Sequence, residues 1–263
     1  MSSQPDAWKP SQYDKFRAER ERPFYDLLSF VRSAAGMRVI DLGCGTGKLT
    51  RELHQQLNAR ETLGIDSSES MLAGTRELEK PGLKFQRGTI ESFGGGEPFD
   101  LIFSNAALHW VPDHESLFGR LAASLSARGQ LAIQMPANDD HAAYRIANDV
   151  AREEPFRTAL GGFVHRSSVL APESYALLLE RLGFSECQVR LHVYLHRLPS
   201  PEGVVEWVRG AMLTDFESRL SPARFAEFVV RYRERVVAAL PPESPTLFTF
   251  KRILLWGTKE IKA

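Results

Sequence analysis

The chain has 263 residues, of which 43% are hydrophobic and 25% charged, as in an ordinary globular protein. Its 33 Lys and Arg balance 33 Asp and Glu, which argues against broad binding to nucleic acid or to an anionic membrane. No apolar run approaches the roughly 20 residues of a membrane span, and the first residues lack the basic and apolar regions of a signal peptide. Cys44 and Cys187 do not have the spacing of a disulfide framework or a zinc site, so we expect a cytoplasmic protein.

Two helical segments are predicted ahead of the first strand, over residues 11–20 and 23–34. Pro23 is favourable in the first turn of the second segment, where apolar side chains recur at helical spacing: Phe24, Leu27, Leu28 and Val31. The earlier stretch mixes aromatic and basic side chains, among them Tyr13 and Arg22. Such a segment can fold across a bound ligand as a lid, or it can be an amphipathic helix with solvated arginines.

A glycine-rich turn follows the first predicted strand, residues 38–42, and opens a helix from Thr46. Gly43 and Gly45 lack a β-carbon, so a ligand can lie against bare backbone. A dinucleotide motif would be G-x-G-x-x-G, but the sixth position is Lys48 and the third glycine comes one residue early. This spacing suits S-adenosylmethionine (SAM), with Asp41 close to the amino-acid end of the ligand. A purely structural turn is the alternative.

The second predicted strand, residues 62–66, ends in Asp66, and a helix is expected from Ser68. An acidic residue about 20 positions after a glycine turn accepts hydrogen bonds from ribose hydroxyls in nucleotide-binding α/β folds. Asp66 could instead be a helix cap or an ordinary loop acid. Together with the glycine turn, it indicates a cofactor site.

The remaining segments complete an α/β pattern. Strands expected over 83–86, 99–104 and 130–135, with a helix from Glu115, predict a doubly wound, Rossmann-like, mostly parallel sheet. Beyond Met135 the pattern changes. A mostly helical stretch is expected over 138–182, two late strands over 188–196 and 247–258, and two further helical segments between those strands, over 201–209 and 222–240. The late strands suit an antiparallel edge pair, and the helical insertion is long enough to be a cap over the ligand cleft.

Further candidates stand at the carboxyl ends of the fourth and fifth strands, where open α/β sheets bind ligands. His109 could donate a hydrogen bond to a substrate carboxylate, and Trp110 could form an apolar or cation–π wall near a sulfonium. Alternatively, His109 caps the next helix and Trp110 belongs to the core. Gln134 would form a second wall of the pocket, or be a satisfied polar group at a strand end.

No other catalytic constellation occurs in the sequence. There is no G-x-S-x-G elbow, H-E-x-x-H motif, C-x-x-C pair or Walker loop. His165, His192 and His196 lack neighbours with metal-ligand spacing, so isolated or surface positions are expected for them. We predict no metal and no dedicated catalytic residue.

Several segments spread along nearly the whole chain carry a family resemblance: residues 8–13, 19–23, the glycine turn, 64–68, 100–114, 134–138, 198–200 and 206–208. The chain resembles class I SAM-dependent methyltransferases and, more closely, the trans-aconitate 2-methyltransferase family. The glycine turn is common to the superfamily, whereas the N-terminal segment and residues 105–114 indicate the narrower family.

The resemblance implies one methyltransferase domain, with N-terminal lid helices over 1–35, a SAM-binding core over 36–136, and helical cap segments over 137–187 and 199–245. The implied cofactor residues are Tyr13, Asp41, Gly43, Gly45, Asp66, Ser67, Met71, Thr89, Ile90 and Asn105. The implied substrate residues are Arg22, His109, Trp110, Gln134 and Trp207.

The sequence departs from the family pattern at two places. An acidic residue usually follows the third strand and would hold the adenine amino group, whereas Thr89 stands there, so Ile90 packing and backbone groups would recognise adenine. A glycine-rich G-T-G usually follows Trp207-Val208, whereas this chain has Gly210-Ala211-Met212. If that segment shapes the acceptor pocket, the second departure bears on the identity of the acceptor.

The sequence therefore favours a carboxyl O-methyltransferase acting on a small di- or tricarboxylic acid such as trans-aconitate. A carboxylate with a pKa near about 4 is ionised at neutral pH and needs no general base, so catalysis reduces to holding nucleophile and methyl about 3 Å apart. Two alternatives stay open: another acceptor (an amine, a phenol or a carrier-bound malonyl group), or a SAM-binding module without activity. We expect a monomer or a homodimer.

Overall fold

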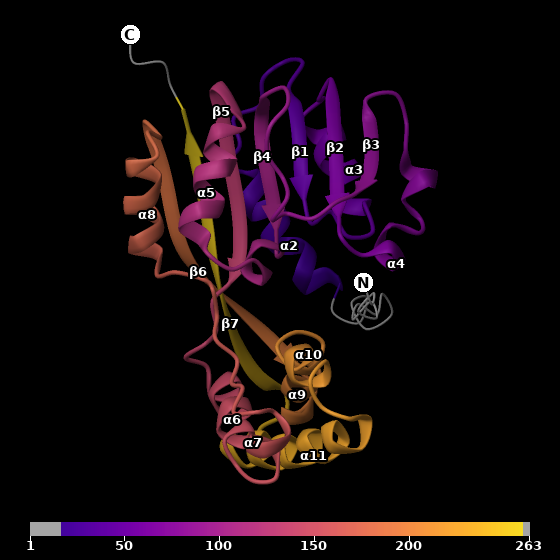
Figure 1. Cartoon of the computed structure of the whole chain (residues 1–263), viewed down its shortest axis with the longest axis vertical. Coiled ribbons are helices and arrows are strands. Elements are labelled where there is room, and N and C mark those ends of the chain that lie inside the picture. Colours follow the sequence, from indigo (N-terminus) through magenta and orange to yellow (C-terminus); the bar gives the residue numbers. More distant parts are fainter. Residues whose placement is uncertain (1–16, 260–263) are drawn as a thin grey trace. The chain divides into compact units, whose positions relative to one another are not determined.

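A computed structural model describes residues 17–259 of the chain. It contains a seven-stranded sheet of order β3-β2-β1-β4-β5-β7-β6 (Figure 1). The strands are β1 (Arg38–Leu42), β2 (Glu61–Asp66), β3 (Leu83–Arg87), β4 (Phe99–Asn105), β5 (Leu125–Pro136), β6 (Glu186–Leu198) and β7 (Thr246–Thr258). β1 pairs in parallel with β2 and β4, as do β2 with β3 and β4 with β5, whereas β7 runs antiparallel to β5. The predicted Rossmann-like class, with a late antiparallel strand, is confirmed.

The two late strands lie next to each other at one end of the sheet, as predicted for an edge pair. β7 lies between β5 and β6, so β6 is the last strand of the sheet. β7 is almost continuously buried from Ile253 to Thr258, which suits an internal strand covered on both faces. β6 instead alternates exposed and less exposed side chains along its length, as an edge strand does.

Helices and shorter turns join and cover the strands. They are α2 (Arg17–Leu28), α3 (Lys48–Gln56), α4 (Glu69–Leu72), η2 (Thr75–Leu78), η3 (Leu108–Trp110), α5 (His114–Ala123), α6 (Ala142–Ala151), α7 (Phe156–Ala159), α8 (Pro172–Arg181), α9 (Pro201–Arg209), α10 (Thr214–Glu217) and α11 (Pro222–Ala239). None of the helices between residues 17 and 259 combines the length and apolarity that crossing a membrane requires.

The N-terminal helix corrects the prediction that a new helix begins at Pro23. Pro23 lies inside α2, which ends at Leu28 instead of continuing to residue 34. A proline within a helix removes one intrahelical hydrogen bond. The buried side chains of Phe24 and Leu27 favour the continuous helix, because Phe24 packs edge-on against Phe103 of β4 with ring centroids 5.3 Å apart.

The start of β5 and the helices within residues 138–182 also differ from the prediction. β5 begins at Leu125 rather than at Gln130, because its first residue already pairs with Phe99 before a register shift in β4. The stretch predicted as mostly helical over 138–182 contains three separate helices, and residues 160–171 are not helical. The positive φ angles of Gly161 and Gly162, 60° and 78°, interrupt it.

The chain divides into two compact units. The sheet unit comprises, of the described residues, 17–136, Ser168–His192 and 252–259, and the helical unit comprises Ala137–Ser167 and Val193–Lys251. Helix α8 therefore belongs to the sheet unit, whereas the sequence analysis assigned it to the cap. In the helical unit, α11 packs against α6 and α9, and the ring of Phe228 lies 4.9 Å from that of Phe216 and 5.3 Å from that of Phe156.

A buried amide fixes the segment after α2 to the sheet. Gln130 Oε1 accepts hydrogen bonds from the Arg32 backbone N–H at 2.8 Å and from Trp256 Nε1 at 2.9 Å, and Gln130 Nε2 donates to the Arg32 carbonyl at 2.7 Å. These contacts join the segment after α2 to β5 and β7.

Candidate functional site

The turn after β1 packs so tightly against its neighbours that side chains at its glycines would not fit. Gly43, Gly45 and Gly47 have φ angles of 79°, 54° and 74°, a region that glycine adopts readily. A Cβ on Gly43 would lie 2.2 Å from Ala107 Cβ, and one on Gly47 would lie 2.6 Å from Phe85 Cε1. The backbone N–H groups of Gly43 and Cys44 both donate to the Ile65 carbonyl, at 2.9 and 3.0 Å. The turn is thus held against β2 and presents bare backbone.

Asp66 joins this turn to the end of β2. Its Oδ2 accepts a hydrogen bond from the Gly45 N–H at 2.8 Å, and its Oδ1 accepts one from the Ser68 N–H at 2.9 Å. Ser68, not Asp66, caps α4, because the Ser68 hydroxyl accepts from the Met71 N–H. A carboxylate offers about four acceptor positions, so Asp66 keeps capacity for two further donors such as ribose hydroxyls.

Asp41 lies beneath the turn and is buried. The pKa of Asp41 is raised to about 7, mainly by burial and also by the negative charge of Asp66. The Thr50 hydroxyl opposes this rise by donating a hydrogen bond at 2.6 Å. Burial and the same two carboxylates raise the pKa of the Cys44 thiol. Two carboxylates beside a glycine turn favour a ligand that carries positive charge, which would stabilise both of them in the ionised form.

Two other predicted cofactor residues, Met71 and Ile90, lie close to the turn. The Met71 methyl group would be 3.2 Å from a Cβ on Gly45, and Ile90 Cδ1 would be 3.9 Å from one on Gly43. Ser67 is exposed between Asp66 and the cap of α4. Thr89 is also exposed, and its hydroxyl is 2.8 Å from that of Ser92.

Asn105 and Gln134 stand opposite each other at the carboxyl ends of β4 and β5. Gln134 is completely buried. Among the described residues, Asn105 Oδ1 and Gln134 Nε2 are buried atoms with no hydrogen-bond partner. Buried polar groups are nearly always paired in folded proteins, so these two atoms mark this edge as a place for a polar ligand.

His109 and Trp110 form the short η3 turn just after β4. Their rings lie 4.7 Å apart and are tilted by 43°. Asp113, rather than His109, caps α5, since Asp113 Oδ1 accepts from the Ser116 N–H at 3.1 Å. Both residues are partly buried. The alternative that His109 caps the next helix is therefore wrong.

Two of the predicted substrate residues contact neighbours within their own compact units. Arg22 is exposed on α2, with its Nε 3.9 Å from Asp26 Oδ2. Trp207 lies in the helical unit and is buried, with its ring 4.6 Å from that of His196 and 5.4 Å from that of Phe250. Tyr13 lies outside the described residues.

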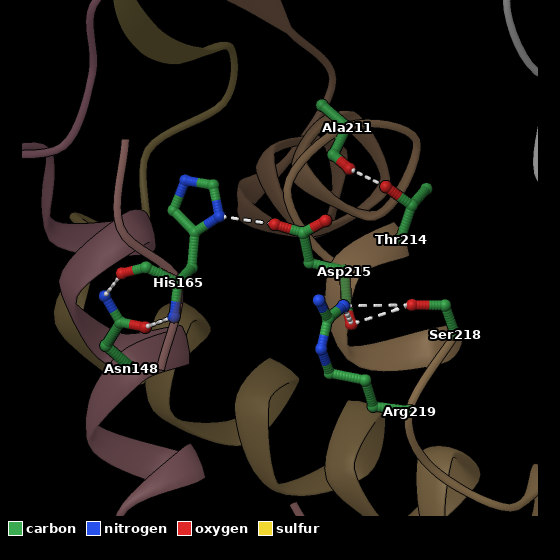
Figure 2. A network of polar contacts seen from close by, with 7 residues as sticks. All are labelled: Asn148, His165, Ala211, Thr214, Asp215, Ser218 and Arg219. Carbon is green, nitrogen blue, oxygen red and sulfur yellow. Dashed lines mark hydrogen bonds and ion pairs between the residues drawn. The ribbon is translucent and has the colours of Figure 1, made fainter. Parts of the chain in front are cut away.

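Two of the histidines correct another expectation. His165 Nδ1 lies 2.7 Å from Asp215 Oδ2, and the Asn148 side chain holds the backbone N–H and carbonyl of His165 at 2.8 and 3.0 Å (Figure 2). His196 is buried. The expectation of isolated or surface positions is thus wrong for these two, because their partners come from distant segments. No group of three or more His, Cys, Asp or Glu within residues 17–259 could hold a metal ion.

Sequence reasoning did not anticipate the role of Thr50, which contacts Asp41 from the first turns of α3. Thr50 is fully buried and nine residues downstream of the carboxylate. A polar side chain on the buried face of the helix that follows a glycine turn is the signal that could have indicated it. The contact leaves Asp41 with a fixed side-chain position.

Comparison with known proteins gives consistent results. A family described as "Methyltransferase domain" matches residues 33–161. A trans-aconitate 2-methyltransferase of Deinococcus radiodurans is 40% identical over 96% of this chain and 98% of its own length. One of Methylobacterium nodulans is 39% identical over 94% of this chain and 96% of its own.

Solved structures resemble the fold at low identity. The YcgJ protein from Bacillus subtilis gives a TM-score of 0.59 at 17% identity, covering 92% of this chain and 99% of that one. A phosphoethanolamine N-methyltransferase of Haemonchus contortus gives a TM-score of 0.55 at 17% identity, covering 91% of this chain and 53% of that one. At such identities the likeness concerns the fold alone.

Proposed function

This chain belongs to the trans-aconitate 2-methyltransferase family, and we propose that it esterifies a carboxylate of trans-aconitate or of a similar small di- or tricarboxylic acid. The methyl donor is SAM. The observation that supports a working cofactor site is the contact between Asp66 and the Gly45 N–H, which joins the two motifs typical of SAM-binding folds at 2.8 Å.

The residues around the turn fit SAM. Gly43 and Gly45 offer backbone that no side chain covers, Asp66 offers acceptor positions for ribose hydroxyls, and Asp41 offers a buried negative charge. Under the proposal the cofactor is held by these four and by Ser67, Met71, Thr89, Ile90, Asn105 and Tyr13. When bound, SAM supplies an electrophilic methyl group on a cationic sulfur.

The protein's own part in the reaction is then positioning and exclusion of water. A substrate carboxylate is already ionised at neutral pH, so no side chain has to remove a proton. Under the proposal, His109 and Trp110 line the acceptor side, and Gln134, Arg22 and Trp207 contribute contacts to the acceptor. Apolar walls favour the transfer because charge is lost when carboxylate and sulfonium become ester and thioether.

Methyl transfer from radiolabelled SAM to a panel of mono-, di- and tricarboxylic acids tests this proposal. We expect labelled product with trans-aconitate or a close relative, and much less of it with Asp66→Ala when SAM is not saturating. Mild base should release the label as methanol, since esters hydrolyse under conditions that leave N-methyl and aryl methyl ether groups intact. Label that resists base would indicate an amine or phenol acceptor, and the absence of transfer by a protein that binds SAM would overturn the proposed reaction.

We propose further that the protein works in the cytoplasm, as a monomer or homodimer, and without nucleic acid. The zero net charge and two free cysteines support this. Light scattering coupled to gel filtration measures the oligomeric state, and a larger assembly would contradict the proposal.

A further inference from the structure

A buried guanidinium stands at the edge of the sheet where β5 ends. Arg252 of β7 pairs with Pro136, the last residue of β5, and its residue surface is only 5% exposed. One of its terminal nitrogens, Nη1, donates a hydrogen bond to Gln134 Oε1 at 3.2 Å. Taking a guanidinium out of water is costly unless acceptors face it, and Gln134 Oε1 supplies one of these acceptors.

The amide of Gln134 adds a second donor at the same place. Since a guanidinium only donates, the oxygen of the carboxamide must face Arg252 and the Nε2 group must face elsewhere. Gln134 is completely buried, and its Nε2 has no hydrogen-bond partner among the described residues. Burying an amide N–H group without an acceptor costs free energy, and a ligand that brings an acceptor beside it removes that cost.

The position of this pair in the sheet is the one where a ligand binds. Gln134 is in register with Asn105 of β4 and with Leu254 of β7, while Phe103 of β4 is in register with Asp41 of β1. The carboxyl ends of β1, β4 and β5 therefore lie along one edge (Figure 1). Open α/β sheets bind ligands outside that edge.

We propose that Arg252 and Gln134 form a subsite for a carboxylate of the methyl acceptor, an inference that rests on the proposed function. A carboxylate accepts hydrogen bonds, donates none and carries negative charge. It therefore complements a guanidinium that lies beside an amide N–H group. Charge-assisted hydrogen bonds to carboxylates are short and strong, and the planar fork of arginine suits them. The sequence analysis had assigned Gln134 to the acceptor, but not Arg252.

The carboxylate held by this subsite is not the one that is methylated. Hydrogen bonds to an arginine withdraw electron density from the carboxylate oxygens and lower their nucleophilicity, and esterification removes the charge that the guanidinium binds. The acceptor must then carry at least two carboxylates, one held by Arg252 and one free to accept the methyl group. Monocarboxylic acids should be poor substrates for this reason.

The test compares Arg252→Gln and Arg252→Lys with wild type, using Lys251→Gln as a matched control. Lys251 is the preceding residue of β7 and forms an ion pair with Asp140, so its substitution removes one positive charge nearby. Each protein is assayed with trans-aconitate and with crotonate, a monocarboxylate with a similar alkene skeleton. Thermal unfolding and calorimetric affinity for SAM show whether each variant keeps its fold and its cofactor site.

We expect Arg252→Gln to lower kcat/KM for trans-aconitate about tenfold to a hundredfold, mainly through KM, as for other lost charge-assisted hydrogen bonds. The affinity for SAM and the low rate with crotonate should stay within about twofold. Lys251→Gln should resemble wild type. Arg252→Lys retains the charge without the planar fork, so its kcat/KM for trans-aconitate should lie between those of wild type and Arg252→Gln. If Arg252→Gln does not fold, Arg252→Lys serves as the test variant.

The outcomes separate the subsite from the proposed function. If wild type methylates trans-aconitate and both Arg252 variants keep the wild-type KM and preference over crotonate, the subsite is overturned and the function stands. If a folded variant loses activity equally on both acids, Arg252 supports the structure and the subsite is again overturned. If wild type binds SAM but methylates no carboxylic acid, the proposed function fails and the subsite fails with it.

Discussion

Thr50 Oγ1 donates a hydrogen bond to Asp41 Oδ2 over 2.6 Å, beneath the glycine turn. This contact favours the ionised form of Asp41, but burial opposes it more strongly, and the pKa of Asp41 lies at about 7. Asp41 therefore changes between its neutral and ionised forms near neutral pH. A cationic ligand end beside it would favour the ionised form.

The affinity for SAM should consequently fall as the pH decreases below 7. In the free protein Asp41 takes up a proton near that pH, whereas the bound cation lowers the pKa, so binding must release the proton. Between the pKa of Asp41 in the SAM-bound protein and its pKa in the free protein, the affinity for SAM decreases by at most about tenfold per pH unit. Above the pKa of the free protein the affinity is constant. Calorimetry at pH 8, 7, 6 and 5.5 measures this. Asp41→Asn should bind weakly with a flat profile, and an unchanged slope in that variant would assign the dependence to another group.

Gly43→Ala should abolish SAM binding and destabilise the sheet unit. The new Cβ would lie 2.2 Å from Ala107 Cβ, at a φ of 79°, so the backbone of the turn or of residues 105–107 must move. Gly36→Ala is the matched control, because Gly36 has a φ of 73° and nothing within 4 Å of its Cβ position. The control should lose about 1–2 kcal/mol of unfolding free energy through backbone strain alone and keep its affinity for SAM. Equal affinity losses in the two variants would show that strain, rather than crowding, governs the site.

Asp66→Ala should weaken binding of SAM and of its demethylated product by about tenfold to a hundredfold, or about 1.5–3 kcal/mol. The variant loses acceptors for the ribose and also the contacts that hold the Gly45 and Ser68 N–H groups. Glu69→Ala is a suitable control, since Glu69 is a neighbouring acid that forms an ion pair with Arg87 at 3.2 Å. An affinity within twofold of wild type in folded Asp66→Ala would exclude Asp66 from the cofactor site.

The sequence predicts best what depends on neighbours along the chain. The first strand was predicted with its observed bounds, Arg38–Leu42, because four buried residues and a glycine turn define it locally. Asp66 was also recognisable, since its partner Gly45 belongs to the adjacent motif. These two features together predict a Rossmann-like fold and a cofactor at one edge of it.

Contacts between distant segments could not be predicted in the same way. Gln134 and Arg252 are 118 positions apart and meet only because β7 inserts beside β5. His165 and Asp215 are 50 positions apart. Pro23 indicated a helix start by its local preference, but the burial of Phe24 and Leu27 favours one helix through it. Tertiary packing thus decides both the missed polar pairs and the wrong helix boundary.

His109→Ala should lower turnover by no more than about tenfold if the acceptor is a carboxylate, because general acid–base catalysis, typically worth about a hundredfold or more, is not needed. His109 stands beside Trp110 at the end of β4, where it would position the acceptor. Activity should be unaffected by a metal chelator. Rates as a function of trans-aconitate concentration, with and without EDTA, measure both effects. Loss of all turnover in a variant that still binds SAM would indicate a base, and hence an amine or phenol acceptor.

Arg22→Lys should restore little of the activity lost in Arg22→Ala if Arg22 binds an acceptor carboxylate. The lysine ammonium keeps the charge but lacks the planar two-donor fork. Arg22 is exposed on α2, and the distance of 3.9 Å between its Nε and Asp26 Oδ2 describes a weak surface ion pair, worth about 0–1 kcal/mol. Pairing with Asp26 therefore does not prevent Arg22 from contacting a ligand.

Asp26→Asn provides the control, because it breaks the same ion pair and leaves the guanidinium in place. We expect Asp26→Asn to keep wild-type kinetics and both Arg22 variants to raise KM for the acceptor several-fold, with unchanged melting temperature and affinity for SAM. If Arg22→Ala and Asp26→Asn behave alike, Arg22 acts only through its ion pair on the helix surface. Dicarboxylic acids that each lack one carboxylate of trans-aconitate should separate Arg22 from Arg252. Substituting either arginine should abolish the preference for trans-aconitate only over the acid that lacks the carboxylate bound by that arginine.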